Sequence, residues 1–218
     1  MLSLRVLALH GKGGSGEVFR NYLSPLILSS SNLHIDWIFP DAPHEIVDNN
    51  KQGFAWWKLP EGVRSFDALN YPGIDASLDI IESHKPFDVI LGHSQGAILS
   101  SIYLATSIAN GDDKLPRGAI LSGAAWASPY NSLLEGIESR TPLDQRSELH
   151  IIHTTSKRDK VNPYHMAIRL ASVFSSVGVN EVVEHEHGHI LPLEELHLEK
   201  YLNLFRKIRA GQATNTKS

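Results

Sequence analysis

One stretch of five residues carries the pattern of a nucleophilic serine. Residues 92–96 read Gly-His-Ser-Gln-Gly, which fits G-x-S-x-G, and they follow the apolar run Phe87–Leu91 and precede a segment of helical character. A serine at such a strand-to-helix junction takes strained backbone dihedral angles that lift its hydroxyl above the sheet. Glycines two positions before and after it prevent a collision between side chains. The pattern therefore predicts that Ser94 is the nucleophile of an acyl-transfer reaction.

A serine hydroxyl is a weak nucleophile at its free pKa, so it needs a base and an acid that orients the base. In this architecture the order along the chain is serine, acid, histidine. Asp159 closely follows the predicted strand Leu149–Thr154, at the sheet edge where open α/β proteins hold their sites, and we predict it as the acid. Helix capping or ion pairing is its ordinary alternative role. Asp144 is the reserve candidate, but it precedes that segment.

The base must be chosen among 12 histidines. His185, His187 and His189 follow the last predicted strand, and we predict His189 as the base, with His187 second. Gly188 permits a tight turn just before His189, and Ile190–Pro192 can anchor the loop after it. A metal site is the rival interpretation of the three histidines. Alternate residues of an extended chain share a face without converging tetrahedrally, so we predict no metal.

The tetrahedral intermediate of acyl transfer needs two backbone donors. One usually comes from the residue after the nucleophile and the other from the loop after the first strand of the core. These positions are Gln95 and Lys12, whose N–H groups are the predicted oxyanion hole. A solvent-exposed turn charge is the ordinary interpretation of the Lys12 side chain.

The loop that contains Lys12 also fits a different motif. Residues 11–16 satisfy G-x-G-x-x-G, and Asp36 lies 36 − 16 = 20 residues beyond Gly16, as in a dinucleotide-binding fingerprint. Under this alternative the protein is an NAD-binding oxidoreductase. It leaves the serine pattern around Ser94 unexplained, so we predict a hydrolase that uses no cofactor.

Aromatic residues are concentrated in two segments without clear periodicity, Asp41–Gly73 and Gly123–Ser147. We predict that they form an apolar acyl pocket at the edge of the sheet, although core packing explains aromatic side chains equally well. The candidate substrate-binding residues are Trp56, Trp57 and Trp126, with Phe54 and Tyr130 as further members.

Short apolar runs alternate with segments of helical periodicity along most of the chain. The predicted strands are Leu4–Leu9, His34–Phe39, Phe87–Gly92, Gly118–Ser122, Leu149–Thr154 and Glu181–His185. The predicted helices are Glu17–Ser29, Ile74–His84, Gln95–Asn110, Pro163–Val177 and Leu193–Ile208. This alternation predicts an α/β fold with a single open, mostly parallel sheet of about six strands and helices on both faces.

Length and composition limit the class of protein. The 218 residues favour one domain, predicted as residues 1–209 with a flexible polar tail at 210–218. The absence of cysteine excludes disulfide frameworks and thiol chemistry, and a formal charge of −4 provides no net field for nucleic acid. We find neither an export signal nor a run of eighteen apolar residues, so we expect a soluble, cytoplasmic protein without a membrane span.

Four segments together resemble the FSH-type serine hydrolases of the α/β-hydrolase superfamily, relatives of the ovarian-cancer-associated hydrolase and of fungal polyketide-releasing thioesterases. These segments are Leu9–Gly11 with Ser15–Phe19, Pro86–Ala97, Asp159–Pro163 and Gly188–Pro192. The resemblance spans nearly the whole chain. It implies a hydrolase without a large cap domain, a Ser94–Asp159–His189 triad, and activity on carboxylic esters or thioesters.

The chain departs from the family pattern at two positions. The family commonly has an aromatic residue after His-Gly and a phenylalanine before the nucleophile, whereas this chain has Lys12 and His93. These differences concern substrate preference, because backbone donors do not depend on side-chain type. A hydrolase-like fold that binds a ligand above an idle triad is the alternative from another class of function.

Overall fold

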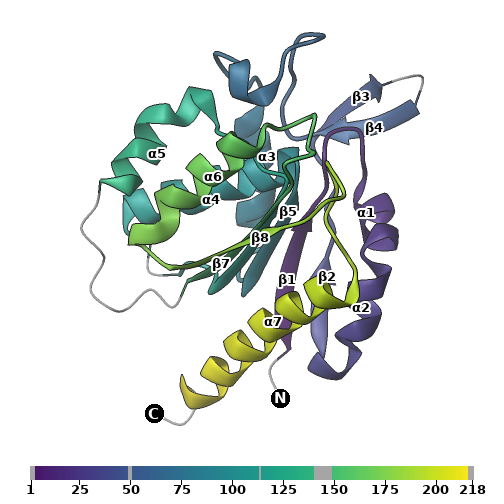
Figure 1. The fold of residues 1–218 in the computed structure, drawn as a ribbon, viewed down its shortest axis with the longest axis vertical. Helices are drawn as coiled ribbons and strands as arrows, with labels where there is room; N and C mark the ends of the chain where they lie inside the picture. Colours follow the sequence, from purple (N-terminus) through teal and green to yellow (C-terminus); the bar gives the residue numbers. More distant parts are fainter. Residues whose placement is uncertain (1–2, 49–50, 113, 140–148, 216–218) are drawn as a thin grey trace.

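The computed structural model describes residues 3–48, 51–112, 114–139 and 149–215, whose main feature is one parallel sheet. It has six strands in the order β2-β1-β5-β6-β7-β8 (Figure 1). The strands are β1 (Leu4–Leu9), β2 (Ile35–Ile38), β5 (Val89–His93), β6 (Gly118–Ser122), β7 (His150–Thr155) and β8 (Val179–Glu184). The predicted α/β architecture with one open parallel sheet is confirmed.

The order of the strands creates a switch point between β1 and β5. From β1 the chain first moves outward to β2, and it then returns to the other side of β1 to form β5 and the strands beyond it. Ligands of open α/β sheets bind outside the carboxyl ends of the strands at such a point. The loop after β1 and the turn after β5, which contain the predicted oxyanion donors and Ser94, both lie there.

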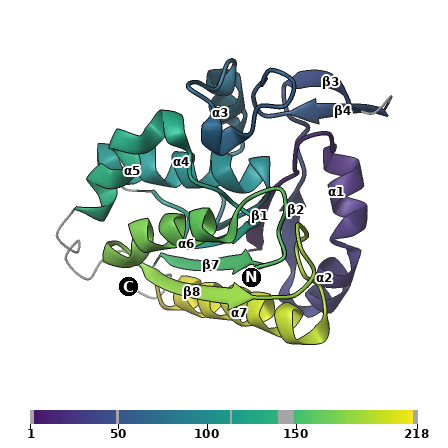
Figure 2. The ribbon, with the colours of Figure 1, turned by 45° about the horizontal axis from the view of Figure 1, so that its top comes forward.

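Helices cover both faces of the sheet (Figure 2). On one face lie α3 (Ile74–Ser83), α4 (Gln95–Asn110), α5 (Asn131–Glu138) and α6 (Tyr164–Val173). On the other face lie α1 (Gly16–Tyr22), α2 (Ser24–Ser29) and α7 (Glu195–Asn215).

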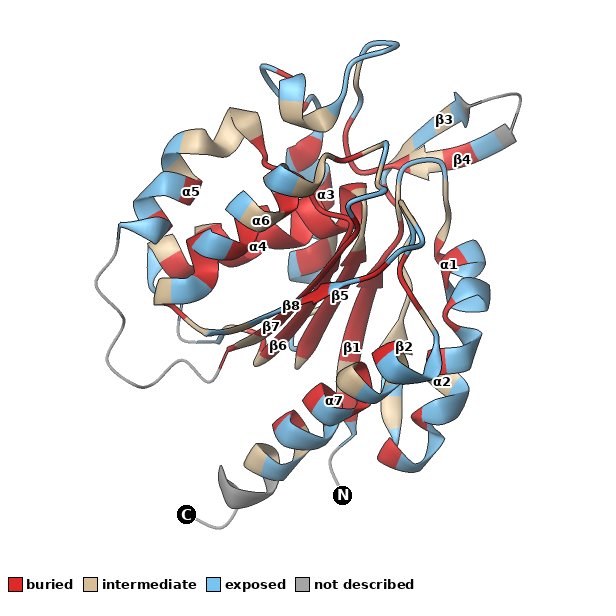
Figure 3. Ribbon diagram, in the orientation of Figure 1, coloured by how far each residue is buried: buried red, intermediate tan, exposed pale blue. Residues whose placement is uncertain are grey.

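The apolar residues of the sheet divide between two hydrophobic clusters. In β1, Leu7 and Leu9 pack into the cluster that includes α4, whereas Val6 and Ala8 pack into the cluster that includes Phe19 and α7. Successive side chains of a strand point to opposite faces, so a strand covered on both sides must be apolar throughout. Figure 3 shows the central strands buried along nearly their whole length.

Several predicted boundaries need correction. The helix predicted over Glu17–Ser29 is two helices, α1 and α2, which meet at Leu23. Pro25 lies in the first turn of α2, where its missing N–H costs nothing, although it cannot continue a preceding helix. The segment predicted as irregular at Gly123–Ser147 contains α5. Asp144 lies outside the described residues.

The segment predicted as irregular at Asp41–Gly73 contains an antiparallel hairpin, β3 (His44–Asp48) and β4 (Lys51–Ala55). β4 also reaches the loop after β1, because the Gly13 N–H donates to the Phe54 carbonyl at 2.8 Å and the Phe54 N–H donates to the Gly14 carbonyl at 2.9 Å. A Cβ atom at Gly53 would overlap the Gly13 carbonyl. The glycine therefore allows the two backbones to touch.

The last helix is longer than predicted. α7 continues past Ile208 to Asn215, so the proposed domain boundary at residue 209 falls inside a helix. Gln212 Nε2 donates to Asp88 Oδ1 at 2.6 Å, and Arg117 Nη1 donates to the Ile208 carbonyl at 3.2 Å. These contacts hold the end of α7 against the amino-terminal edge of the sheet. No helix in the described part of the chain is both long and apolar enough to cross a bilayer.

A buried histidine in the sheet gives a pH-dependent stability. Burial lowers the pKa of His153, in β7, to about 4, although Asn180 acts in the opposite direction. The unfolded chain therefore takes up this proton first, near pH 6.5, and the free energy of unfolding falls as the pH drops below that value, by about 1 kcal/mol per pH unit.

We expect His153→Leu to have a shallower loss of stability between pH 6.5 and 4.5 than the unsubstituted protein. Urea unfolding at a series of pH values measures this slope. The exposed His165 should leave the slope unchanged when it is replaced by glutamine. Equal slopes for the unsubstituted protein and His153→Leu would contradict the assignment.

Candidate active site

Ser94 sits in a strained turn between β5 and α4. Its φ of 54° and ψ of −117° lie in a region that side-chain-bearing residues rarely adopt. A Cβ at Gly92 would overlap the Gly96 carbonyl, and a Cβ at Gly96 would overlap the carbonyl of Leu9. The steric reason predicted for the two glycines is therefore confirmed, and the second glycine also allows α4 to begin directly against the end of β1.

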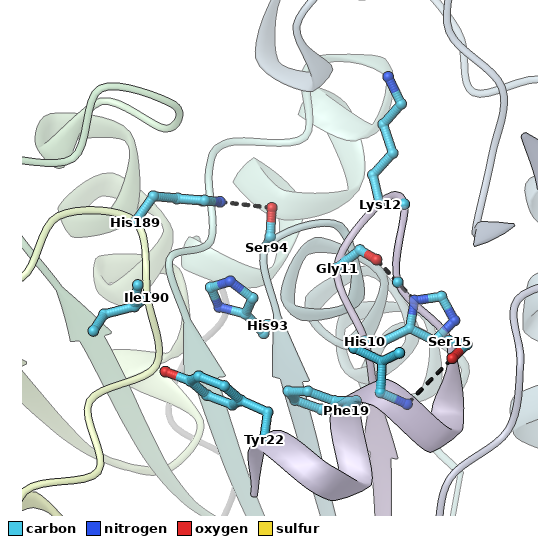
Figure 4. Close-up of a pocket in the computed structure, with 13 residues that line it drawn as sticks. His10, Gly11, Lys12, Ser15, Phe19, Tyr22, His93, Ser94, His189 and Ile190 are labelled. Carbon is cyan, nitrogen blue, oxygen red and sulfur yellow. Dashed lines mark hydrogen bonds between the residues drawn. The ribbon is translucent and has the colours of Figure 1, made fainter. Parts of the chain in front are cut away.

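A chain of hydrogen bonds connects the hydroxyl of Ser94, the imidazole of His189 and the carboxylate of Asp159. Ser94 Oγ donates to His189 Nε2 at 2.8 Å (Figure 4). His189 Nδ1 lies 2.6 Å from Asp159 Oδ2 and must be the donor, because an ionised carboxylate only accepts. The structure thus brings together the three residues predicted as nucleophile, acid and base.

Asp159 is held as an ionised acceptor. Its side chain is 2% exposed, and its Oδ1 accepts from the N–H groups of Val161 at 2.7 Å and Asn162 at 2.9 Å. Burial acts to raise the pKa of this carboxyl. The hydrogen bonds from His189 and the two amides outweigh burial and hold the pKa below its ordinary value. The carboxylate is therefore charged over the working pH range and can fix the tautomer of His189.

The turn that carries Asp159 and the loop that carries His189 share an anchor. Ser156, buried at the end of β7, accepts at its Oγ from the N–H groups of Arg158 at 3.1 Å and Gly188 at 3.3 Å. Gly188 has a φ of 72°, which confirms the tight turn predicted before His189. One hydroxyl therefore sets the distance between the acid and the base.

Two further contacts fix this corner of the site. Asn162 Nδ2 donates to the Gly123 carbonyl at 2.6 Å, and a Cβ at Gly123 would come within 3.2 Å of the His189 ring. On the far side of the loop, Tyr22 Oη donates to the Leu191 carbonyl at 2.6 Å. Asn162 is not among the predicted site residues, because an amide side chain in a loop has no distinctive pattern.

His187, the second candidate base, points to a different partner. Its Nε2 lies 2.7 Å from Glu194 Oε1, and its ring stacks on His185 at 5.7 Å between centroids. It is therefore engaged on the α7 side of the loop rather than at Ser94. Within the ranges that the structure describes, no three histidine, aspartate or glutamate side chains are arranged to hold a metal ion.

The predicted oxyanion donors lie at the ends of neighbouring strands. Within the described residues, the N–H groups of Lys12 and Gln95 donate to no other protein group. The Gln95 side chain instead holds the chain after β4, since its Oε1 accepts from the Trp56 N–H at 2.8 Å and its Nε2 donates to the Trp57 carbonyl at 3.1 Å. Trp56 Nε1 in turn donates to the His10 carbonyl at 2.8 Å, beside Lys12.

The structure does not bring the three predicted substrate-binding tryptophans to Ser94. Trp56 and Trp57 are 0% exposed and Trp126 is 2% exposed, so none presents a surface to a ligand. Trp57 stacks on Tyr71 with ring centroids 4.3 Å apart, and the guanidinium of Arg169 lies 3.6 Å from the Trp126 ring centroid. All three side chains pack in the hydrophobic core, where Trp56 also holds the loop after β1 through its hydrogen bond to the His10 carbonyl.

A cavity of about 340 Å³ opens beside Ser94 on the side of α1 (Figure 4). Its walls include the glycine-rich loop Gly11–Gly14, the α1 residues Val18, Phe19 and Tyr22, and Ile190. His93, Ser94 and His189 line it at the sheet edge. The aromatic residues of α1 were missed as site residues because their spacing in the sequence is that of an ordinary amphipathic helix.

The residues around the glycine-rich loop do not fit a dinucleotide. Asp41 Oδ1 accepts from the Gly16 N–H at 2.7 Å, and Ser15 Oγ accepts from the Val18 N–H at 3.2 Å, so the first amides of α1 are occupied. A pyrophosphate at this position would meet the negative charge of Asp41. Asp36, the predicted ribose ligand, lies 3.3 Å from Arg5 Nε.

A known family model covers most of the chain. Residues 1–201 match the family model described as serine hydrolase (FSH1). The chain belongs to this family. Membership of this family makes the protein a serine hydrolase, and its fold is that of the α/β hydrolases.

Relatives and solved structures cover most of the chain. An esterase of Drosophila pseudoobscura pseudoobscura is 26% identical over 217 residues, which span 93% of this chain and 71% of that protein. The human esterase OVCA2 is 29% identical over 223 residues, with 91% and 94% covered. The crystal structure of Arabidopsis thaliana SOBER1 superposes with a TM-score of 0.67 at 18% identity, covering 95% of this chain and 99% of that one. This last likeness concerns the fold.

The close packing of α4 against β1 predicts a strong effect of Gly96→Ala. The new methyl group would overlap the Leu9 carbonyl, so we expect the free energy of unfolding to fall by about 3 kcal/mol or the protein not to fold. Gly136→Ala is the matched control, because open space surrounds that position in α5, and should stabilise by about 0.5–1 kcal/mol. Equal effects in chemical denaturation would contradict the steric account.

The contact between Trp56 and His10 predicts a difference between two similar variants. Trp56→Phe removes the N–H that holds the loop bearing Lys12, and we expect kcat to fall about fivefold with little change in KM. Trp57→Phe removes an indole N–H that has no partner among the described residues, so its kcat should fall less. Steady-state kinetics on a chromogenic ester measures both. A larger loss of kcat in Trp57→Phe would refute the bracing role of Trp56.

Proposed function

We propose that the protein hydrolyses carboxylic esters or thioesters of small molecules through an acyl-Ser94 intermediate. The observation that carries this proposal is the unbroken line of hydrogen bonds from Ser94 to His189 and Asp159 at the rim of a cavity. Esterases among the relatives support the same reaction class.

The first half of the reaction forms the acyl-enzyme. Ser94 Oγ attacks the carbonyl carbon of the substrate while its proton passes to His189 Nε2, with which it already shares a hydrogen bond. The resulting imidazolium is stabilised by the carboxylate of Asp159, which stays ionised. The tetrahedral intermediate collapses when the bond to the leaving oxygen or sulfur breaks and that atom takes the proton from His189.

The second half restores the free serine. A water molecule gives its proton to His189 Nε2 and attacks the acyl carbon, and the bond to Ser94 Oγ then breaks as that oxygen regains the proton. The net change is one ester or thioester and one water converted to an acid and an alcohol or thiol. No cofactor is needed for this balance.

The N–H groups of Lys12 and Gln95 serve as the oxyanion hole in this proposal. Both are free of other protein acceptors within the described residues, and both follow strands that adjoin at the switch point. An oxyanion-hole donor is typically worth about 10²–10³ in kcat. Trp56 holds the loop after β1 through its bond to the His10 carbonyl, and the Gln95 side chain holds Trp56 in turn. The loop therefore need not reorganise during the reaction.

We expect a fluorophosphonate probe to label the protein at Ser94. The hydrogen-bonded hydroxyl reacts with phosphorus electrophiles, whereas an ordinary turn serine does not. Mass mapping should find one modified residue in the unsubstituted protein and none in Ser94→Ala. Ser101→Ala is the matched control, since its hydroxyl only donates to the Ile98 carbonyl within α4, and this variant should label normally.

The same experiment separates this proposal from the alternative of a ligand receptor with an idle triad. A receptor would bind small molecules without covalent labelling and would show no ester turnover. Absence of labelling in the folded, unsubstituted protein, or labelling that persists in Ser94→Ala, would overturn the assignment of Ser94.

A further inference from the structure

His93 is a polar residue in the cavity for which the reaction described above has no use. It is the last residue of β5, directly before Ser94, and its ring centroid lies 5.1 Å from that of His189. Figure 4 shows the His93 ring between the Ser94–His189 pair and the side chain of Tyr22. Every step of acyl transfer is served by other groups, so the presence of an imidazole here needs its own explanation.

The neighbouring polar rings of the cavity already have protein partners. His10 Nδ1 donates to the Gly11 carbonyl at 2.8 Å, and its Nε2 accepts from the Ala42 N–H at 3.1 Å. The hydroxyl of Tyr22 donates to the Leu191 carbonyl. In contrast, Nδ1 of His93 is buried without a well-aligned hydrogen-bond partner in the described part of the chain, although a backbone group of Ser122 lies close enough to the ring to influence its pKa. A buried polar atom in this state costs free energy unless a ligand or water satisfies the ring.

The ring of His93 is uncharged when the enzyme works. Burial, reinforced by the nearby His189, lowers its pKa to about 3, although the charge of Asp159 and a backbone group of Ser122 act in the opposite direction. A neutral imidazole carries one N–H donor and one lone-pair acceptor, and its tautomer decides which of the two faces a ligand. A hydroxyl group can both donate and accept, so it suits either tautomer, whereas a carboxylate or an ammonium group suits one at most.

The position of the ring indicates which part of the substrate it meets. The carbonyl oxygen is served by Lys12 and Gln95 in the proposed function, and the leaving atom is served by His189. The acyl chain stays bonded to Ser94, and the cavity beside it is walled by His93 together with the apolar side chains of Phe19 and Ile190. A polar group that His93 contacts therefore belongs to the acyl chain, close to the reacting carbon.

We propose that His93 is a specificity-determining residue that selects acyl groups bearing a hydroxyl on the second or third carbon. This inference rests on the proposed function, since it assumes that the cavity beside Ser94 holds the acyl group. It goes further by assigning a substrate class, hydroxyacyl esters or thioesters, to this cavity.

The test compares three esters of one alcohol: butanoate, 2-hydroxybutanoate and 3-hydroxybutanoate. For each hydroxylated ester, the discrimination ratio is its kcat/KM divided by that of butanoate. We expect the unsubstituted protein to have a ratio above one, by about tenfold, for at least one hydroxylated ester. The position of the preferred hydroxyl distinguishes the second carbon from the third.

Variants at position 93 decide whether this residue is the cause. His93→Phe keeps a planar ring without nitrogen, and its ratio should fall about tenfold toward one. His93→Gln keeps a donor and an acceptor and should retain part of the preference, which also guards against poor folding of the phenylalanine variant. Tyr22→Phe is the matched control from the same cavity, and its ratio should stay close to that of the unsubstituted protein, because the Tyr22 hydroxyl is already engaged.

Two results would overturn this inference. One is a ratio at or below one for both hydroxylated esters in the unsubstituted protein, which would mean that no hydroxyl group of the substrate binds to His93. The other is an unchanged ratio in His93→Phe. Fluorophosphonate labelling of Ser94 in the same samples keeps the proposals apart: a labelled protein without hydroxyl preference refutes only the role of His93, whereas an unlabelled one refutes the proposed function.

Discussion

The hydrogen bond between Ser94 Oγ and His189 Nε2 joins residues that are 95 positions apart in the chain, and the surrounding contacts serve to hold it. On the serine side, two glycines allow a strained turn that no other residues in those places would permit. On the histidine side, Gly188 turns the backbone, while Ser156 and Asp159 fix the loop and the ring. In the proposed reaction, the geometry of attack is thus set before a substrate arrives, which is the condition under which such groups accelerate a reaction most.

The loop after β1 is constrained by elements that are remote from it in sequence. The hairpin β3–β4 pairs with Gly13 and Gly14, Trp56 bonds to His10, and the Gln95 side chain holds the segment after β4. Gln95 therefore has two parts: its backbone belongs to the proposed oxyanion hole, and its side chain braces the structure that positions the other donor. We therefore expect Trp56 and the Gln95 side chain to influence the rate of the reaction rather than the affinity for substrate.

Much of this architecture can be predicted from the sequence, because local chemistry restricts it strongly. Parallel strands that are covered on both faces are largely apolar, so β1, β5 and β6 are found in the sequence as nearly continuous apolar runs. The glycines around Ser94 and before His189 have steric causes that act within a few residues. These constraints explain why the structure brings Ser94, Asp159 and His189 together as the sequence indicates.

The remaining features of the fold and of the site depend on long-range contacts that a single sequence does not display. Gly53 allows β4 to approach a loop forty residues earlier, and Gln212 near the end of α7 donates to Asp88 just before β5. The tryptophans were expected at a pocket, yet the same residue type fills a core equally well, and only the fold decides. His93 is an opposite case. It lies inside the G-x-S-x-G pattern, but its proposed role follows from the cavity that it lines together with residues of α1.

The most direct measurement of the central claim is a double-mutant cycle on Ser94 and His189. If the two residues act as one unit, Ser94→Ala, His189→Ala and the double variant should have the same residual kcat for ester hydrolysis, within about threefold, because removing one member already abolishes the joint step. A double variant whose loss equals the product of the two single losses would show that they act independently, and it would contradict the account.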